Sequence, residues 1–446
     1  MISKSSTQQK KGSLVKILLF YAWGNENAGD KALALGTIES LRQCFPSAKI
    51  EVVSIFEKRN DSFETSRKYI ADRYPDIRML PNSLLLGHKL GDSKIVKLFR
   101  RILLVLGFCC PLILKYVYKG SAVYNALLES DIVLLNGGHL IFWSDRMGEK
   151  QAIMKRYILP FVLARRLKKR YILLAQSFGP FEFNKRNYLF YLIIKYVIAG
   201  ASSISVRDSS SLSHLKMLMG RTDGVRRVLD SAFFLTERDD SNTSLILKRH
   251  SLIPKGFLAI TVRLSKRGSQ KNLDAELYES YANKIVQFIE LWTMNQSIPI
   301  VFVCQVPKDV EDTGFILSKL SEEQRNKCVV IKENFSPEVL ISLYANATAL
   351  IGMRFHSLVF ALSANTPVIG LYYYDIGPKI KGIMSDLGYP EYAFCIDDIS
   401  SDRLYHSVSN LLTDVHDLSK KLEDRISSLK KASLDTLMSQ IEVMGN

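Results

Sequence analysis

The chain has 446 residues, which exceeds the usual size of one hydrophobic core, so two domains are expected. Hydrophobic residues make up 47% and charged residues 23% of the sequence, as in an ordinary globular protein. The formal net charge of +16 favours polyanions, anionic lipid surfaces or anionic small substrates as partners. The sequence has no nucleic-acid-binding motif and no dense Lys/Arg run, which argues against nucleic acid among these partners.

The six cysteines form neither a CxxC pair nor a Cys/His cluster. We therefore expect no disulfide framework and no metal site, and a reducing cytoplasm fits this pattern. Residues 1–13 are polar and Lys-rich and lack the apolar core of a signal peptide, so they are expected to form a disordered leader.

Residues 102–114 (ILLVLGFCCPLIL) form a continuous apolar run, and its 13 residues are too few to cross a bilayer as a helix. Lysines and arginines flank the run on both sides. One interpretation is a buried helix pair broken at Pro111. The other is that residues 94–119 are a basic interfacial segment that touches an anionic membrane. In the second case the protein would be peripheral at the inner face of the plasma membrane.

Strands and helices are expected to alternate along both halves of the chain. Short apolar runs predict strands at 14–21, 50–56, 131–135, 171–175, 203–206, 257–262, 298–303, 329–331, 349–352 and 367–372. Helical spacing predicts helices at 31–44, 157–166, 188–199, 273–294 and 337–345. This order predicts an α/β protein with two Rossmann-like domains, 14–240 and 257–398, that face each other across a cleft.

Two further segments complete the predicted organisation. Residues 241–256, within a polar stretch, are expected to form the linker between the domains. Residues 399–446 carry an apolar stripe among Lys, Asp and Glu, which predicts one or two amphipathic helices that pack on the body.

Several polar residues follow directly after predicted strands. They are Gly29 and Asp30, the run Gly137-Gly138-His139, Arg207 and Asp208, Arg263, Gln305, Arg354 and His356, and Lys379. Each has a structural explanation: Asp is a favoured N-cap, and Gly eases tight turns. Ligands of such folds bind at the carboxyl ends of the strands, so these residues would together line the cleft between the domains. Arginine and lysine suit an anionic ligand, and histidine suits proton transfer.

Motifs for several other activities are missing. No P-loop occurs, which disfavours an NTPase, and no GxGxxG follows a strand, which disfavours a dehydrogenase. The nucleophile elbow GxSxG and the zinc motif HExxH are also absent.

An ordered set of motifs resembles the polysaccharide pyruvyl transferase family. The motifs are Asn27-Ala28-Gly29-Asp30, Gly137-Gly138, Ser177-Phe178-Gly179-Pro180, Arg207-Asp208 with Ser211, Asp230 to Phe233, and Gly352-Met353-Arg354-Phe355-His356. The resemblance extends in order from about Val15 to about Pro390. It implies a fold similar to the two-Rossmann-domain (GT-B-like) glycosyltransferases. It also implies transfer of a pyruvyl group from phosphoenolpyruvate to a hydroxyl pair of a surface-polysaccharide sugar, which forms a ketal.

The resemblance also implies partners and residue roles. The partners are phosphoenolpyruvate, as donor substrate rather than cofactor, and a sugar or lipid-linked oligosaccharide acceptor; no metal is required. The catalytic residues would be His356, which protonates the enol methylene, and Asp30, a base for the sugar hydroxyl. The donor would be bound by Arg354, Lys379, Arg263 and Gly352. The acceptor would be bound by Asn27, Gly29, Gly137, Gly138, His139, Arg207 and Asp208.

The chain departs from the family pattern at three places. Phe355 stands where Leu is usual, and His139 follows the glycine pair where a smaller or apolar residue is expected. The turn 372–378 is longer than the family's usual spacing, so Lys381 is a rival of Lys379 for the phosphate.

Two other functions remain open. The first is a nucleotide-sugar glycosyltransferase of the same architecture, in which Asp375 or Asp386 would bind the ribose. The second is a non-catalytic relative that binds an anionic sugar. The presence of Arg354 and His356 argues against this second possibility.

Overall fold

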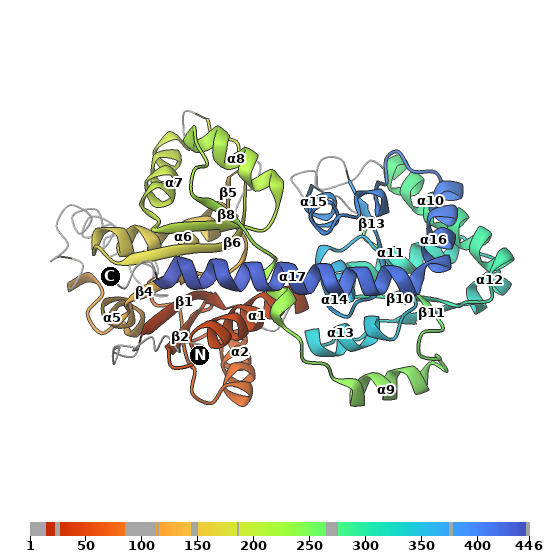
Figure 1. The fold of residues 1–446 in the computed structure, drawn as a ribbon, viewed down its shortest axis with the longest axis horizontal. Helices are drawn as coiled ribbons and strands as arrows, with labels where there is room; N and C mark the ends of the chain where they lie inside the picture. Colours follow the sequence, from red (N-terminus) through yellow and green to blue (C-terminus); the bar gives the residue numbers. More distant parts are fainter. Residues whose placement is uncertain are drawn as a thin grey trace, which may run out of the picture.

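The computed structural model describes residues 15–22, 27–84, 113, 116–143, 150–184, 187–264, 275–373 and 378–442. Two β-sheets with entirely parallel pairing lie side by side, each covered by helices (Figure 1). This arrangement confirms the predicted α/β architecture of two Rossmann-like domains. Of the suspected membrane segment 94–119, only Ile113 and residues 116–119 are described. Among the described residues, no helix has both the length and the apolar character needed to cross a bilayer.

The N-terminal sheet has the strand order β3-β2-β1-β4-β6-β7-β8, and β5 pairs with β6. Its strands are β1 (Lys16–Ala22), β2 (Lys49–Ser54), β3 (Arg78–Leu80), β4 (Ile132–Leu135), β5 (Gly138–Trp143), β6 (Arg170–Phe181), β7 (Ser203–Val206) and β8 (Val225–Arg227). Its helices are α1 (Ala28–Cys44), α2 (Asp61–Arg73), α5 (Ala122–Glu129), α6 (Lys150–Arg166), α7 (Tyr188–Gly200) and α8 (Ser209–Met219). Strand β1 is buried at every residue after Lys16, as expected for a continuous apolar run in the middle of a parallel sheet.

Two sequence expectations in this domain are wrong. Helix α1 begins at Ala28 rather than Lys31, because the Oδ1 atom of Asn27 accepts the backbone N–H of Gly29 at 2.9 Å. Asn27 is therefore the N-cap, and Asp30 lies in the first turn. His139 lies in strand β5 rather than in a loop, because the apolar residues after the glycine pair continue into a strand beside the second half of β6.

The C-terminal sheet has the order β11-β10-β9-β12-β13-β14. Its strands are β9 (Leu258–Thr261), β10 (Ile300–Val303), β11 (Cys328–Ile331), β12 (Ala349–Gly352), β13 (Val368–Tyr372) and β14 (Ala393–Cys395). Its helices are α10 (Ala275–Asn295), α11 (Pro307–Ser318), α12 (Glu322–Asn326), α13 (Pro337–Ala345), α14 (Phe355–Ser363) and α15 (Pro378–Leu387), with the 3-10 turn η4 (Pro390–Tyr392). All four residues of β9, β10 and β12 are buried, which explains their uninterrupted apolar sequences.

The segment between the domains contains regular structure. The 3-10 turn η3 (Ser231–Phe234) packs on α1, and helix α9 (Asp240–Arg249) packs on α13. Much of the expected linker 241–256 therefore belongs to a helix. Its polar sequence still permits this, because Asp239 caps the helix by accepting the N–H of Asn242 at 3.0 Å and because Ile246 is buried.

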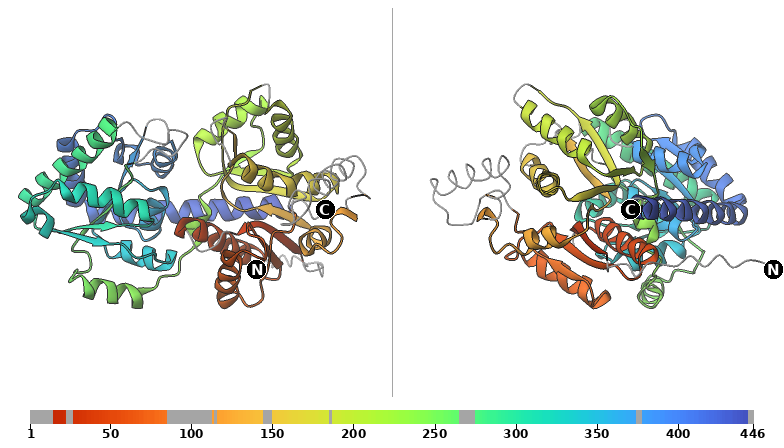
Figure 2. Two further views of the ribbon diagram at one scale, coloured as in Figure 1. Left: turned by 180° about the vertical axis from the view of Figure 1, so that it is seen from behind. Right: turned by 60° about the vertical axis from the view of Figure 1, so that its left-hand side comes forward.

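Two helices end the chain, α16 (Ser401–Thr413) and α17 (Val415–Glu442), as the apolar stripe predicts. Helix α17 runs from the C-terminal domain across to the N-terminal domain (Figures 1 and 2). In the C-terminal domain Arg425 donates to the carbonyl oxygen of Asp386 at 3.0 Å. In the N-terminal domain the Oγ atom of Ser433 accepts the backbone N–H of Leu229 at 2.9 Å. One cluster of buried apolar residues includes members of both domains and of α17, so the two sheets share part of their core.

Candidate active site

The N-terminus of α1 meets the N-terminus of α14 where the two domains face each other. Gly29 is buried in the first turn of α1, and a Cβ atom at this position would lie only 2.0 Å from Nδ1 of His356. The imidazole of His356 therefore lies against the backbone of Gly29, a close approach that only glycine allows. Asp30 is the next residue of the same turn. The two residues predicted to be catalytic thus come from opposite domains and lie at one junction.

Residues Gly352 to His356 carry the chain from strand to helix in the C-terminal domain. Gly352 is the buried end of β12 and packs against the side chain of Leu358. Arg354 is at the N-cap position of α14 with extended backbone, and His356 lies in the first turn. The junction therefore brings together the N-terminal ends of α1 and α14, and both ends favour negative charge.

Arg354 is held by a carboxylate of its own domain. Its Nε atom donates to Oδ2 of Asp309 at 2.6 Å, and its Nη2 atom donates to Oδ1 of the same residue. The buried Asp309 also accepts the backbone N–H groups of Gln305 and Val306 at 3.0 and 3.3 Å. This two-pronged ion pair orients the guanidinium group, whose side chain stays 20% exposed. An anionic ligand would have to use the remaining N–H groups of Arg354.

Arg207 has a different environment in the N-terminal domain. Its Nε atom donates to Oγ of Ser177 at 2.8 Å, and its Nη1 atom forms a salt bridge with Asp230. Only 3% of the Arg207 side chain is exposed. Inside the protein its guanidinium connects its own motif with the motifs of Ser177 and Asp230. Its Cζ atom also lies 5.1 Å from the ring centre of Phe355, a cation–π contact between the two domains.

Asp208 is the N-cap of α8, as the sequence predicts, and its carboxylate is fully occupied. It accepts the N–H of Ser211 at 2.9 Å and the hydroxyl groups of Ser177, Ser210 and Ser211 at 2.5, 2.6 and 2.7 Å. Burial acts to raise the pKa of Asp208, but these hydrogen bonds and the charge of Arg207 outweigh burial and lower the pKa to about 2. Asp208 is therefore a permanent anion at neutral pH.

His139 faces the C-terminal domain beside Lys379. Its Nε2 atom lies 2.5 Å from the carbonyl oxygen of Gly179, so Nε2 carries the hydrogen and donates it. Burial first, and then the positive charge of Lys379, hold the pKa of His139 well below its ordinary value. His139 is therefore neutral at physiological pH and suited to a fixed hydrogen bond rather than to holding an anion.

The two candidate lysines differ in their positions on α15. Lys379 is half-buried and close enough to His139 to affect its pKa, whereas Lys381 is exposed. Helix α15 packs on α8 across the domain boundary, with Gly382 beside Asp208. The structure therefore favours Lys379 over Lys381 as the lysine directed toward the junction.

The remaining predicted residues lie around this centre. Gly137, between β4 and β5, and Gly138, the first residue of β5, are both buried, and a Cβ atom on Gly137 would lie 2.9 Å from Oγ of Ser231. The close approach of Gly137 is thus to another part of the protein. Arg263 follows β9 and is half-buried, and its carbonyl oxygen accepts the hydroxyl of Tyr373. The alternative ribose-binding residue Asp386 forms a salt bridge with Arg227 of the other domain. Asp375 lies outside the described residues.

Sequence reasoning missed three residues at the domain boundary: Asp309, Tyr157 and Glu338. Burial first, and then the negative charge of Asp30, raise the pKa of Tyr157, which places Tyr157 close to that carboxylate. Glu338 on α13 accepts the hydroxyl of Tyr69 at 3.0 Å and forms a salt bridge with Arg73, both from α2. Pro337 and Glu338 suggest only a helix start, so nothing local in the sequence indicates these distant partners.

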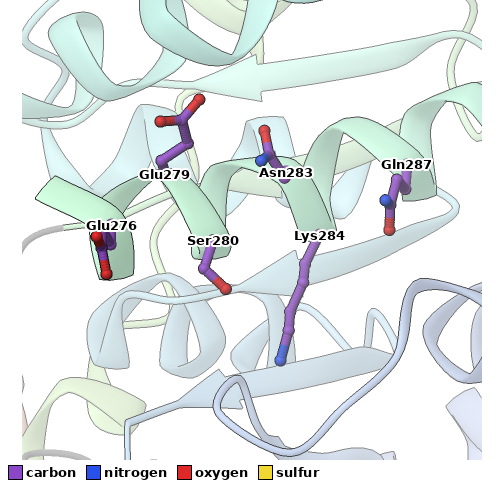
Figure 3. Close-up of a pocket in the computed structure, with 6 residues that line it drawn as sticks. All are labelled: Glu276, Glu279, Ser280, Asn283, Lys284 and Gln287. Carbon is purple, nitrogen blue, oxygen red and sulfur yellow. The ribbon is translucent and has the colours of Figure 1, made fainter.

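An open pocket lies away from this junction, along α10. Its lining residues are Glu276, Glu279, Ser280, Asn283, Lys284 and Gln287. Figure 3 shows their side chains pointing in different directions along the helix. Lys284 is used structurally, because its Nζ atom donates to the carbonyl oxygens of Ile396 and Asp397 at 2.7 and 2.8 Å.

The two parallel sheets, the junction between them and the returning C-terminal helix define a GT-B-like protein, the fold of glycosyltransferases and UDP-GlcNAc 2-epimerases. Anabaena Alr3699/HepE, solved in complex with UDP, superposes with a TM-score of 0.57 at 12% identity, covering 96% of this chain and 100% of that one. The UDP-GlcNAc 2-epimerase of Neisseria meningitidis, solved with UDP-GlcNAc, superposes with a TM-score of 0.52 at 11% identity, covering 95% and 100%. At these identities the similarity concerns the fold alone.

The sequence identifies the family. Residues 27–375 match the polysaccharide pyruvyl transferase family, and the chain belongs to it. It is also similar to the amylovoran biosynthesis protein AmsJ of Erwinia amylovora, with 24% identity over 426 residues, which cover 92% of this chain and 94% of that protein.

Proposed function

We propose that this protein transfers a pyruvyl group from phosphoenolpyruvate to two hydroxyl groups of one sugar, forming a ketal and releasing phosphate. The sugar would belong to a surface polysaccharide, in keeping with the family and with the relative named for amylovoran biosynthesis. The observation that carries the proposal is the contact of His356 with the first turn of α1, which also holds Asp30. A proton donor from one domain and a carboxylate base from the other are what this reaction needs.

The reaction proceeds in two additions. His356 donates a proton to the methylene carbon of phosphoenolpyruvate, and the adjacent carbon becomes cationic. A sugar hydroxyl attacks this carbon while Asp30 accepts the hydroxyl proton. Phosphate then leaves with its bonding electron pair and takes up the proton held by Asp30. The second hydroxyl attacks the same carbon and gives its proton to the imidazole of His356, which restores the acid form of His356. The products are the cyclic ketal and inorganic phosphate.

The donor's negative charges would be held by groups on the C-terminal side. Lys379 on α15 supplies a point charge for the phosphate, and Arg354 supplies N–H groups in a fixed orientation for the carboxylate. The N-terminal ends of α1 and α14 add partial positive charge at the same junction. Groups that are already oriented need no rearrangement when charge develops in the transition state.

Arg207 would position the site rather than bind the donor. Its guanidinium is buried with Ser177 and Asp230 and stacks on Phe355, the residue before His356. An aromatic ring at position 355, where Leu is usual in the family, adds this cation–π contact. The contact ties the first turn of α14 to the opposite domain, so it would help to hold the imidazole in place.

The test is a turnover assay with the full-length protein. Purified protein is incubated with phosphoenolpyruvate and a panel of lipid-linked and free sugars, and phosphate release and product mass are followed. We expect phosphate release that requires the acceptor and a product heavier by one pyruvyl ketal. In His356→Ala the rate should fall about 10³-fold, because general acid–base catalysis contributes about 10²–10⁴-fold. His406→Ala, at an exposed position on α16, is the matched control and should keep full activity.

The same assay tests the alternatives. Turnover of nucleotide-sugars without any turnover of phosphoenolpyruvate would identify a glycosyltransferase and overturn the proposal. Binding of phosphoenolpyruvate or of an anionic sugar with no product in any combination would indicate the non-catalytic relative. We assign the reaction to the cytoplasm, at the inner face of the membrane where a lipid-linked acceptor would be presented.

A further inference from the structure

Helix α7 exposes large apolar side chains to solvent. Tyr188 is 57% exposed, Leu189 71% and Leu192 44%, although the opposite face of the helix, with Phe190 and Ile194, is buried in the domain. Nine large hydrophobic residues are exposed among the described residues, and three of them lie on this one helix. Isolated exposed apolar residues are ordinary, but a group on one helix marks a contact surface.

The exposed face of α7 also carries tyrosines and a lysine at helical spacing. Tyr188, Leu192 and Lys195 lie one turn apart in succession, on one side of the helix. The Nζ atom of Lys195 donates to the hydroxyl of Tyr191 at 3.2 Å and lies 5.2 Å from the centre of that ring. Tyrosine and lysine combine an apolar body with a polar tip, a composition typical of the boundary between lipid headgroups and acyl chains.

The charge of this region suits an anionic surface. From Asn187 to Arg221 the sequence contains one acidic residue, Asp208, which is buried and fully hydrogen-bonded. The basic residues in this interval include Lys195, which is half-buried, and Lys216, which is exposed on the neighbouring helix α8. Beside Lys216, Met217 is 76% exposed and adds a further apolar side chain on α8.

The position of α7 relative to the site is also informative. Helix α8 packs beside α7 and begins at Asp208, next to α15 of the other domain (Figure 1). A surface bound through α7 would therefore lie on the N-terminal domain, with α8 between it and the domain boundary (Figure 1). Helix α7 packs on α6 and α8 of its own domain.

We propose that the exposed face of α7, formed by Tyr188, Leu189, Leu192 and Lys195, docks on an anionic lipid bilayer. The apolar side chains enter the interfacial region, and Lys195 faces the anionic headgroups, with Lys216 on the neighbouring helix α8 as a second positive charge. None of these residues belongs to the segment 94–119, and the inference does not depend on the reaction that the protein catalyses.

Vesicle co-sedimentation of the full-length protein tests this docking. We expect binding to vesicles of phosphatidylcholine with phosphatidylglycerol, and much weaker binding to phosphatidylcholine alone. The double variant Leu189→Glu with Leu192→Glu should bind at least about tenfold more weakly, because it removes apolar insertion and adds negative charge. The matched control is Leu245→Glu with Ile253→Glu, two residues 61% and 73% exposed in or next to α9, which should bind like the wild type.

Three outcomes would overturn the proposal. The first is no vesicle binding by the wild type. The second is binding that survives in the α7 variant but is lost when Arg100 and Arg101 are changed to Glu, which would assign the contact to residues 94–119. The third is a wild-type dimer by light scattering that becomes monomeric in the α7 variant without any vesicle binding, which would make this face an interface between copies. Circular dichroism of each variant checks that it is folded. If the double variant is unfolded, the milder change Lys195→Glu replaces it in the vesicle assay.

Discussion

Arg207 and Arg354 look alike in the sequence, since each follows a strand and precedes a helix, but the structure gives them different environments. Arg207 is nearly inaccessible and joins Ser177 and Asp230 inside one domain. Arg354 pairs with a single carboxylate, that of Asp309, and keeps an exposed edge at the domain boundary. The first arginine is part of the framework, and the second is positioned to meet a ligand. The same residue type at the same kind of place therefore does two different jobs.

Removing each arginine in turn is the most direct test of this difference between Arg207 and Arg354. Arg207→Ala leaves Asp230 buried without its counter-charge, and it should lower the free energy of unfolding by about 3–5 kcal/mol. Arg354→Ala should cost less stability, because the buried Asp309 keeps the backbone N–H groups of Gln305 and Val306 as donors. This variant should mainly raise KM for phosphoenolpyruvate. Chemical denaturation and steady-state kinetics of both variants measure the two effects. Equal losses of stability would mean that the two arginines are equivalent.

Gly29 tests whether the contact between the domains sets the geometry of His356. Gly29→Ala puts a Cβ atom where the imidazole lies, so the ring must move. We expect kcat to fall roughly 100-fold, since a displacement of about 1 Å in a catalytic group can cost that much. Gly314→Ala on α11 is the control, because a Cβ atom there meets nothing within 4 Å, and it should keep full activity. A normal kcat in Gly29→Ala would exclude the close contact from catalysis.

Asp208 makes the framework of the N-terminal domain sensitive to acid. Its pKa is lowered to about 2 in the folded protein, below its value in the unfolded chain. Its contribution to stability is therefore complete above about pH 5 and is lost as the pH falls toward 2. A shift of this size corresponds to roughly 2 kcal/mol. In Asp208→Asn the free energy of unfolding should decrease less between pH 5 and pH 2 than in the wild type. An unchanged decrease would show that Asp208 does not cause it.

The smallest expected effect separates the two lysines of α15. Lys379→Met should raise KM for phosphoenolpyruvate about tenfold, because it removes one partly screened charge contact with the phosphate. Lys381→Met should leave KM unchanged. Lys379→Met should also raise the pKa of His139, because the charge of Lys379 lowers it in the native protein. NMR titration of the histidine rings measures that change. If Lys381→Met raises KM and Lys379→Met does not, Lys381 rather than Lys379 binds the phosphate.

The sequence predicted those features that depend on local pattern. The buried strands, the order of the motifs, the amphipathic end of the chain and the N-cap Asp208 all follow from the spacing of apolar and capping residues. The cap at Asn27 and the strand β5 were missed for local reasons, since Asp30 competes as a cap and a glycine pair resembles a turn. The contacts of Arg354 with Asp309 and of Arg73 with Glu338 were missed for another reason. Each joins residues 45 or 265 positions apart, and only the folded chain brings them together.

Helix α17 has a consequence for the order in which the molecule can be completed. Domains generally fold in turn as the chain leaves the ribosome, with the N-terminal part first. Here the backbone N–H of Leu229 and the hydroxyl of Ser203 find their partners, Ser433 and Gln440, only in the last helix. The N-terminal domain can therefore complete these two contacts only after α17 has been synthesised.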